Sequence, residues 1–313
     1  MDTLLEEEAN YVLGLSRSPE KNSIFLPYSG RRTNRFQFRQ VDLYRESKKI
    51  LAYLDEYQPT VIINVAALSE VGLSNFQPVE YFETNTLGVV SLCNELRTRS
   101  YLKRYVHIST AEVYGTCKEP LKESASINPS TPYAISKAAA DLYLLTLYRH
   151  FGFPVQLIRS TNVYGKHQQL FKIIPRCIIY LKQRKKIELH GGGRAIKTWV
   201  HIRDVVDGIN QAIKVGEPGE IYHFSDTNSM SIDSLVHTIC ELMHYDFGER
   251  TVAVSERMGQ DAQYLLDYEK AKKKLHWLPK IKFLDGLKET IRWVEDNWKE
   301  IEFQPLEYIH HVR

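Results

Sequence analysis

The sequence predicts an α/β fold: a doubly wound parallel sheet with helices on both faces, followed by a smaller and mostly helical lobe. Two observations support this fold class. Short, nearly continuous apolar runs alternate with longer amphipathic stretches along the first half of the chain, which is typical of a parallel sheet wound with helices. After about residue 163 the alternation loosens, and helical patterns with short strands between them predominate. We therefore expect two lobes of different architecture.

Five strands are expected in the first lobe. Each is a short run dominated by apolar residues, as expected where both faces of a strand are covered. Helical patterns separate most of them, which favours parallel pairing. The runs occupy residues 11–16, 35–40, 60–66, 104–109 and 154–159.

Six longer segments place apolar residues three and four positions apart, the spacing that fills one face of a helix. The first three lie between the strands, and the last three belong to the second lobe. In contrast, residues 21–35 are expected to form an exposed loop, and Gly191 to Gly193 a turn between two strands. The helical segments cover residues 44–57, 79–99, 132–151, 166–186, 231–245 and 283–298.

Composition excludes several classes of protein. With 313 residues, 43% of them hydrophobic, the chain can bury a large core. Lys and Arg number 41 against 38 Asp and Glu, a surplus too small for a general polyanion binder, so no nucleic-acid partner is expected. No apolar run approaches the roughly 20 residues that span a bilayer, and the start is acidic, so we expect no membrane segment and a cytoplasmic protein. Four widely spaced cysteines suggest reduced thiols, and no metal site is expected.

A chemically informative pattern begins the helix expected over 132–151. Tyr133 and Lys137 are four residues apart and share one helix face, where the Lys137 ammonium can favour the ionised Tyr133 phenol. Ser109 and Thr110 end a buried strand, at the edge where doubly wound folds place their ligands. Such a phenol can act as a base toward an alcohol whose proton Thr110 shares. The alternative is a surface tyrosine above a solvated lysine, which this context disfavours.

Seven motifs connect the chain to a known family. They are NVAAL (64–68), TNTLG (84–88), STAEVYG (109–115), INPSTPYAISKAAAD (127–141), STNVYG (160–165), TWVHIRDV (198–205) and RMGQDAQYLLD (257–267). With them the sequence resembles the extended short-chain dehydrogenases/reductases, specifically the NAD(P)-dependent sugar-nucleotide epimerases and dehydratases, closest to the dTDP-glucose 4,6-dehydratase-like enzymes. The resemblance covers nearly the whole chain. It implies a Rossmann domain and a nucleotide-diphosphate sugar as substrate.

The resemblance also implies a role for each matching residue. Tyr133 is the base for oxidation at the sugar C4, Lys137 holds the nicotinamide ribose, and Thr110 binds the C4 hydroxyl. The cofactor would also be contacted near Ala66 and Asn85, with Asn85 supporting the active-site helix. The substrate would be bound by Ser69, Thr110, Asn162, Lys197 and Arg257. Lysine at 197 departs from the usual arginine and offers phosphate a point charge in place of a planar fork.

A second departure lies in STAEVYG. The glucose dehydratases have Asp-Glu after the threonine, whereas this chain has Ala111 and Glu112. In their mechanism a carboxylate removes the C5 proton and an acid helps the C6 hydroxyl leave as water. Glu112 would be the C5 base, and either it performs both steps or a water or another side chain supplies the acid. Alternatively no water is lost, as in a 4-epimerase or a uronic-acid decarboxylase. We expect the dehydratase, a lyase, before the isomerase, because a pure 4-epimerase has little use for a carboxylate at 112.

The beginning of the chain lacks the usual opening of such a domain, a strand followed by a Gly-rich turn. Residues 1–8 already read as the tail of the first helix. We expect truncation or renumbering of the sequence rather than a true departure from the fold, because the centre of the sheet would otherwise be open. A non-catalytic NAD(P)- or sugar-nucleotide-binding protein remains an alternative for the chain as given.

Cofactor preference is expected at the end of the strand over 11–16, where NAD enzymes usually carry an acidic residue. Ser16 and Arg17 occupy that position, and a hydroxyl with a guanidinium suits a 2′-phosphate. Nearby Ser18, Arg31, Arg32 and Arg35 could add to it. We therefore expect NADP, with NAD as the alternative that most close dehydratase relatives use.

Asp42 and Leu43 follow the next strand and match the pair that contacts adenine in the family. Asp42 is equally well placed to cap the helix expected over 44–57. The two roles do not exclude each other.

The resemblance divides the chain into two domains. Residues 1–163 form the dinucleotide-binding domain, to which 196–226 return, while 164–195 and 227–313 form the substrate-binding lobe.

Two helices of the first domain carry wider apolar stripes than an isolated subunit needs. They are the segments 84–96 and 136–148. Members of the family often pair these helices in a four-helix interface, so we expect a homodimer.

Overall fold

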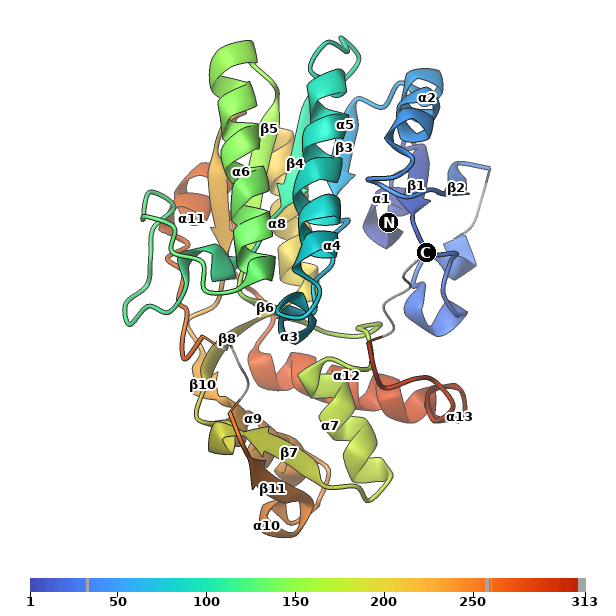
Figure 1. Cartoon of the computed structure of the whole chain (residues 1–313). Coiled ribbons are helices and arrows are strands. Elements are labelled where there is room, and N and C mark those ends of the chain that lie inside the picture. Colours follow the sequence, from blue (N-terminus) through green and yellow to red (C-terminus); the bar gives the residue numbers. More distant parts are fainter. Residues whose placement is uncertain (32–33, 257–258, 260, 309–313) are drawn as a thin grey trace.

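The computed structural model describes residues 1–31, 34–256, 259 and 261–308. Figure 1 shows two lobes, with the parallel sheet and its covering helices above and a smaller, largely helical lobe below. The predicted α/β fold class is confirmed.

A four-stranded parallel sheet forms the centre of the first lobe. Its strands are β3 (Val61–Asn64), β4 (Arg104–Ile108), β5 (Val155–Ser160) and β9 (Ile221–Phe224), paired in the order β3-β4-β5-β9. The first five residues of β5 are buried. Such burial explains why the central runs show no polar alternation.

Helices cover both faces of this sheet (Figure 1). α2 (Ser47–Tyr57), α5 (Gly88–Leu96) and α6 (Pro132–Phe151) share one apolar core with the sheet. α8 (Ile202–Val215) and α11 (Glu269–Leu275) share another on the opposite face. The sheet is thereby held between two layers, which brings the carboxyl ends of its strands to one edge.

The first two strands stand apart from that sheet. β1 (Val12–Ser16) pairs in parallel with β2 (Phe36–Gln40), preceded by α1 (Asp2–Glu6). Within the described ranges, no strand pairs with β1 on its other side or with the outer edge of β3. Both strands are apolar but only partly buried, as expected for strands with one unpaired edge. The opening predicted from the sequence therefore lies between β1 and β3.

The segment over 21–35 is only in part the exposed loop that the sequence predicts, and its Arg32 lies outside the described residues. Ile24, in the short 3-10 helix η1 (Ser23–Phe25), is 6% exposed and packs into the core of the second lobe. Arg31 forms ion pairs with two acidic side chains of α1, and Arg35 donates to backbone carbonyls at the end of that helix. Both arginines therefore hold α1 in place, and these bonds are not made to residues at the end of β1.

Three helices enclose the core of the second lobe: α7 (Ile173–Lys182), α9 (Ile232–Leu242) and α12 (Phe283–Asp296). Two small sheets border them, β10-β8-β6 and β11-β7. The strands are β6 (Asn162–Tyr164), β7 (Ile187–His190), β8 (Ile196–His201), β10 (Ser229–Ser231) and β11 (Thr251–Val254). The remaining elements are η2 (Ser29–Arg31), α3 (Val71–Ser74), α4 (Pro78–Phe82), η3 (Glu83–Leu87), η4 (Ala111–Tyr114), η5 (Gly191–Gly193), α10 (Phe247–Arg250) and α13 (Trp298–Ile301). As predicted, Gly191 to Gly193 join β7 to β8.

One short segment differs from the expected division of the chain. Ala271, Leu275 and Trp277 pack with α8 and β9 in the core of the first lobe. The indole N–H of Trp277 also donates to the Asp204 carbonyl at 2.7 Å. This part of 227–313 therefore belongs with the sheet domain.

Among the described residues, no helix combines the length and apolar composition that a membrane span needs. In the same part of the chain, no group of three or more His, Cys, Asp or Glu side chains could hold a metal ion. The four cysteines are free thiols.

Candidate active site

Thr110 and Tyr133 meet beyond the carboxyl end of β4. Tyr133 lies in the first turn of α6, whose start is fixed by Pro132 and by the Thr131 hydroxyl, which accepts a hydrogen bond from the Ala134 amide. Thr110 lies near the Tyr133 hydroxyl, each residue is 8% exposed, and the Thr110 hydroxyl accepts a hydrogen bond from the Glu112 amide at 3.3 Å. The structure thus brings Thr110, Glu112 and Tyr133 together.

A glycine turn holds the motif that carries Glu112. Gly115 has a φ of 65°, and a Cβ there would lie 2.3 Å from the carbonyl oxygen of Asn128. Only glycine fits both the conformation and the close approach. This turn ends η4 and keeps Glu112 beside Tyr133.

The Tyr133 phenol is held in its neutral form. Burial raises the pKa of Tyr133 well above its ordinary value, and the Glu112 carboxylate raises it further, since both disfavour a phenolate. The Thr110 hydroxyl acts in the opposite direction. Lys137 is not among the main influences on the pKa of Tyr133, so the expectation that it lowers this pKa is not met.

Lys137 shares the helix face of Tyr133 but is bonded to the sheet. Its Nζ donates to the carbonyl of Ile108 at 2.7 Å and lies 3.2 Å from Nε2 of His107. Lys137 is 1% exposed, and burial lowers the pKa of Lys137 to about 8, although the Asp141 carboxylate opposes this. The charge of Lys137 therefore depends on Ile108 and His107 of β4 and on Asp141 of its own helix.

A buried polar network lies beneath these residues. Oδ2 of Asp141 accepts hydrogen bonds from the Ser109 hydroxyl at 2.7 Å and from the Arg159 guanidinium at 2.8 and 3.1 Å. Arg159 also donates to the Tyr114 hydroxyl, which lies 2.7 Å from Nε2 of His223. The network ties α6 to β4 and β5 under the site.

Glu112 is the carboxyl group that the structure places at this site. Burial raises the pKa of Glu112 to about 7, the Lys197 ammonium lowers it, and the Asp261 carboxylate raises it. A carboxyl that changes charge near neutral pH can both accept and return a proton. The preceding Ala111 is 1% exposed and packs with Ala138, so position 111 supplies neither acid nor base.

Two of the predicted substrate residues, Asn162 and Lys197, adjoin Glu112. The Tyr264 hydroxyl donates to Oδ1 of Asn162 at 2.9 Å, and Nδ2 of Asn162 donates to the Thr198 carbonyl at 3.2 Å. Nζ of Lys197 lies 4.3 Å from the centre of the Tyr264 ring and donates to the carbonyl of Asp261 at 2.8 Å. Asn162 and Lys197 are thus oriented on one wall.

The carboxylate of Asp261 is held by two hydroxyl groups. Its Oδ1 accepts hydrogen bonds from Thr116 at 3.1 Å and from Ser130 at 2.9 Å. It therefore links the motif around Glu112 to the start of α6. The predicted substrate residue Arg257 lies outside the described residues.

Asn85 joins the β3 loop to the active-site helix. Its amide exchanges hydrogen bonds with the backbone of Leu68 at 2.8 and 3.0 Å and donates to the Ser136 hydroxyl at 3.0 Å. Asn85 lies in a π-helical turn, η3, that interrupts the helix expected over 79–99. π-helical turns often occur at functional sites. The amide supports α6, as the resemblance implies, and does not line the cavity described next.

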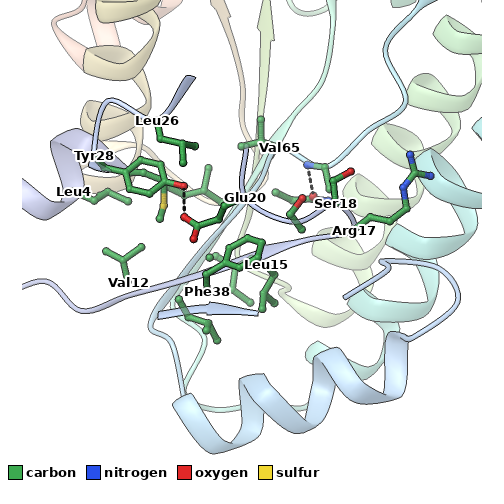
Figure 2. Close-up of a pocket in the computed structure, with 18 of the residues that line it drawn as sticks. Leu4, Val12, Leu15, Arg17, Ser18, Glu20, Leu26, Tyr28, Phe38 and Val65 are labelled. Carbon is green, nitrogen blue, oxygen red and sulfur yellow. Dashed lines mark hydrogen bonds between the residues drawn. The ribbon is translucent and has the colours of Figure 1, made fainter. Parts of the chain in front are cut away.

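A cavity of about 1810 Å³ extends between β1, β3 and the second lobe. Five predicted positions line it, namely Ser16, Arg17, Asp42, Leu43 and Ala66, together with Ser69. Figure 2 shows the apolar side chains of β1 and β2 on one wall, Arg17 and Ser18 at one end, and the Tyr28 hydroxyl donating to Glu20 at the other. Tyr133 and Lys137 are not among its lining residues and lie beyond it, where Leu68 packs against Tyr133.

Asp42 does not cap the helix, because α2 begins at Ser47 and its N-cap residue is Glu46. Its Oδ1 instead accepts hydrogen bonds from the amides of Tyr44 and Arg45, both at 2.9 Å, and its own amide donates to Glu46. These bonds close the turn before α2. Asp42 and Leu43 also line the cavity, so an adenine contact stays a prediction.

Three further residues belong to the site although the sequence does not single them out. Asp141 follows Lys137 by four residues, so the helical spacing alone would have placed both on one face. His107 lies two positions before Ser109 on a strand, and therefore on the same side of the sheet. Tyr264 lies within the motif of 257–267, in which only Arg257 was predicted to bind substrate.

Comparison with known proteins is consistent with this geometry. The family model described as GDP-mannose 4,6 dehydratase matches residues 1–290. The human dTDP-D-glucose 4,6-dehydratase is 33% identical over 254 residues, which span 77% of this chain and 71% of that protein. A dTDP-glucose 4,6-dehydratase of Streptomyces venezuelae, solved with NAD and TYD bound, has a TM-score of 0.88 at 30% identity and covers 96% of this chain and 91% of its own. A UDP-glucose 4-epimerase of Thermotoga maritima shares the fold, with a TM-score of 0.86 at 22% identity over 95% of this chain and 94% of its own.

Proposed function

Because this chain belongs to the GDP-mannose 4,6-dehydratase family of the extended short-chain dehydrogenases/reductases, we propose that it is a nucleotide-diphosphate-sugar 4,6-dehydratase. The substrate class follows from its relatives, which are dTDP-glucose 4,6-dehydratases. The reaction removes one water from the sugar and leaves a 6-deoxy-4-keto sugar, without net oxidation or reduction.

The observation that carries this proposal is the position of Glu112 beside Thr110 and Tyr133. Thr110 and Tyr133 together can hold the C4 hydroxyl and accept its proton. Oxidation at C4 acidifies the C5 proton, and a carboxylate is then needed to remove it. A 4-epimerase needs no such carboxylate, so Glu112 favours dehydration over epimerisation.

Glu112 serves in our proposal as both base and acid. With a pKa of about 7 its carboxylate can take the C5 proton and, once protonated, give it to the C6 hydroxyl as the C–O bond breaks. Ala111 offers no acid, and Asp261 is held by Thr116 and Ser130. One carboxyl group therefore suffices for the elimination.

One end of the cavity offers the phosphates of a dinucleotide two hydroxyls and a guanidinium, at Ser16, Arg17 and Ser18. The apolar part between β1 and β3 is the opening in the sheet described above and is not assigned to the cofactor. Ser16, Arg17, Asp42, Leu43 and Ala66 would hold the adenosine half, and Tyr133 and Lys137 the nicotinamide ribose. When bound, the dinucleotide accepts a hydride from C4 and returns one at C6, and its positive ring favours the Tyr133 phenolate.

The choice between NAD and NADP rests on Arg17. The solved S. venezuelae enzyme contains NAD. In this chain the cavity end carries Ser16, Arg17 and Ser18 without a carboxylate among them, which supports NADP. Arg31 and Arg35 do not contribute, since both are engaged with α1. We therefore propose that NADP is preferred.

Lys197 and Asn162 are proposed to bind the sugar nucleotide. Both lie on the wall next to Glu112, and Lys197 brings an ammonium group to it. Diphosphate would replace part of the contact that Lys197 makes with the Asp261 carbonyl. Ser69 would contact the sugar from the opposite side.

A homodimer is proposed through α5 and α6. These helices lie side by side on the surface of the first lobe (Figure 1). Large apolar side chains on and beside them are exposed, including Leu87 at 44%, Leu142 at 52% and Phe151 at 58%. Such a face is typical of a subunit interface. The free thiols support a reducing compartment, and we place the protein in the cytoplasm.

Product mass tests the proposed reaction. The chain is incubated with dTDP-glucose and either NAD or NADP, and the product is examined by mass spectrometry while free reduced dinucleotide is followed by absorbance. A product lighter by one water, with no accumulation of free reduced dinucleotide, supports the dehydratase. A product of unchanged mass would instead support the 4-epimerase, which the lack of an acid at Ala111 leaves as the second candidate.

A further inference from the structure

His107 and Lys137 face each other in a closed pocket between β4 and α6. His107 is fully buried and Lys137 is 1% exposed. Nε2 of His107 lies 3.2 Å from Nζ of Lys137, and Nζ also donates to the Ile108 carbonyl. The donor and acceptor roles in this contact depend on where the imidazole carries its proton.

Asn64 determines the position of that proton. Its Oδ1 accepts a hydrogen bond from the Ala66 amide at 3.1 Å, which fixes the orientation of the side-chain amide. Nδ2 of Asn64 therefore faces Tyr105 Oη at 2.9 Å and His107 Nδ1 at 3.3 Å. Since Nδ2 is only a donor, Nδ1 of His107 is an acceptor. A neutral imidazole must then carry its proton on Nε2.

The protonated Nε2 points toward Lys137. An ammonium group has donors only, so an ammonium at 3.2 Å from an N–H would be a donor-donor contact. A neutral amine has a lone pair that can accept from Nε2–H while the amine still donates to Ile108. The hydrogen-bond pattern therefore favours the neutral form of Lys137.

The other charged groups in the pocket belong to the same arrangement. Oδ1 of Asp141 is buried, accepts no hydrogen bond from the described residues, and lies 3.9 Å from Nε2 of His107, which attracts a proton to that nitrogen. The same carboxylate favours the Lys137 ammonium, but its charge is shared with Arg159 on β5. Tyr105 stacks beside His107 on β4, and Tyr133 lies one turn before Lys137 on α6.

We propose that His107 is a positioning residue of the active site: Asn64 holds its proton on Nε2, and the resulting N–H disfavours the ammonium form of Lys137. Lys137 then changes charge nearer neutral pH than an exposed lysine does, and the charge that it brings to the active site changes with it. Only this catalytic consequence rests on the proposed function.

The tautomer can be observed directly in the unmodified full-length chain. Long-range proton–nitrogen correlation spectra of histidine-labelled protein distinguish an imidazole protonated on Nε2 from one protonated on Nδ1. The account expects the Nε2–H form for His107. The Nδ1–H form would overturn it.

Two substitutions then test the effect on Lys137. In His107→Gln the amide oxygen can accept from Asn64 while the amide N–H faces Lys137, whereas His107→Phe removes that donor. Titration of the carbon-13-labelled Lys137 side chain should leave its midpoint nearly unchanged in the glutamine variant and raise it by about one pH unit or more in the phenylalanine variant. Equal midpoints in the wild type and both variants would refute the proposal, whatever activity the protein has.

Kinetics provide a second readout. The alkaline limb of the kcat/KM profile should move to higher pH in His107→Phe and return in His107→Gln, with thermal melting reported for each variant. If both variants lose stability while the limb stays in place, His107 is only structural and the proposal fails. If His107→Phe does not fold, the tautomer in the wild-type protein still decides.

Discussion

The hydroxyl of Tyr264 donates to Oδ1 of Asn162 at 2.9 Å, so a tyrosine of the 257–267 segment orients an amide at the start of the second lobe. Because Nδ2 of Asn162 is also tied to the Thr198 carbonyl, this side chain has little freedom to turn. The wall on which we place the sugar nucleotide is thus built from three separated parts of the chain.

Tyr264→Phe should weaken substrate binding and leave the chemical step intact. Loss of one hydrogen bond of about 0.5–1.5 kcal/mol predicts a KM for the sugar nucleotide raised about two- to tenfold, with kcat nearly unchanged. Steady-state kinetics measures both values. A fall in kcat with no change in KM would contradict the role given to Asn162.

Glu112→Gln should stop the reaction after oxidation at C4. The amide cannot remove the C5 proton, so reduced dinucleotide should accumulate on the enzyme and be visible by absorbance during a single turnover. Exchange of the C5 proton with deuterated solvent should disappear as well. Continued loss of water in this variant would show that another group is the base.

The raised pKa of Glu112 also predicts how stability depends on pH. The native state favours the protonated carboxyl, so its contribution to folding is present at low pH and is lost as pH rises through about 7. Glu112→Gln should therefore be more stable than the wild type at alkaline pH and gain less at acidic pH. Urea unfolding on both sides of neutrality measures this, and an equal gain at both would contradict it.

Arg17→Ala should change cofactor preference. Removing a charge-assisted hydrogen bond of about 1.5–3 kcal/mol predicts NADP binding at least about tenfold weaker, with NAD binding little affected. Arg39→Ala is a suitable control, because Arg39 is exposed on β2 and does not line the cavity. Equilibrium titration with both dinucleotides decides, and equal losses for NAD and NADP would argue against a 2′-phosphate contact.

Asp141→Ala should destabilise the protein strongly. It leaves the buried Arg159 without its carboxylate partner, for which the expected cost is about 3–5 kcal/mol in the free energy of unfolding. Asp55→Ala breaks the more exposed ion pair with Arg99 and should cost less than about 1 kcal/mol. Denaturant unfolding of the two variants compares them, and similar losses would contradict the anchoring role of Asp141.

The sequence predicted the strands and helices well because their local patterns and their burial agree. The helix from Pro132 to Phe151 was predicted with its observed bounds, since Thr131 and Pro132 mark its start and Gly152 its end. The π-helical turn around Asn85 was not foreseen, because hydrophobic periodicity does not distinguish it from an ordinary helix. The packing of Ile24 against the second lobe is a long-range contact that no local pattern in its segment predicts.

The chemistry of the site was only partly predictable. Motifs located Thr110, Glu112, Tyr133 and Lys137, but the spacing of Tyr133 and Lys137 did not reveal that Lys137 bonds to β4. The direction of the Tyr133 pKa depends on burial and on Glu112, which only the folded chain brings near it. His107 and Asn64 act through a donor and acceptor arrangement between neighbouring strands, which no local pattern contains.

The most direct test of the central claim follows a hydrogen within the sugar. A nucleotide sugar labelled with deuterium at C4 is converted by the protein, and the product is analysed by NMR spectroscopy. A 4,6-dehydratase must place that deuterium in the C6 methyl group of the 4-keto product. Deuterium found at C4 of an epimer, or absent from C6, would contradict the account.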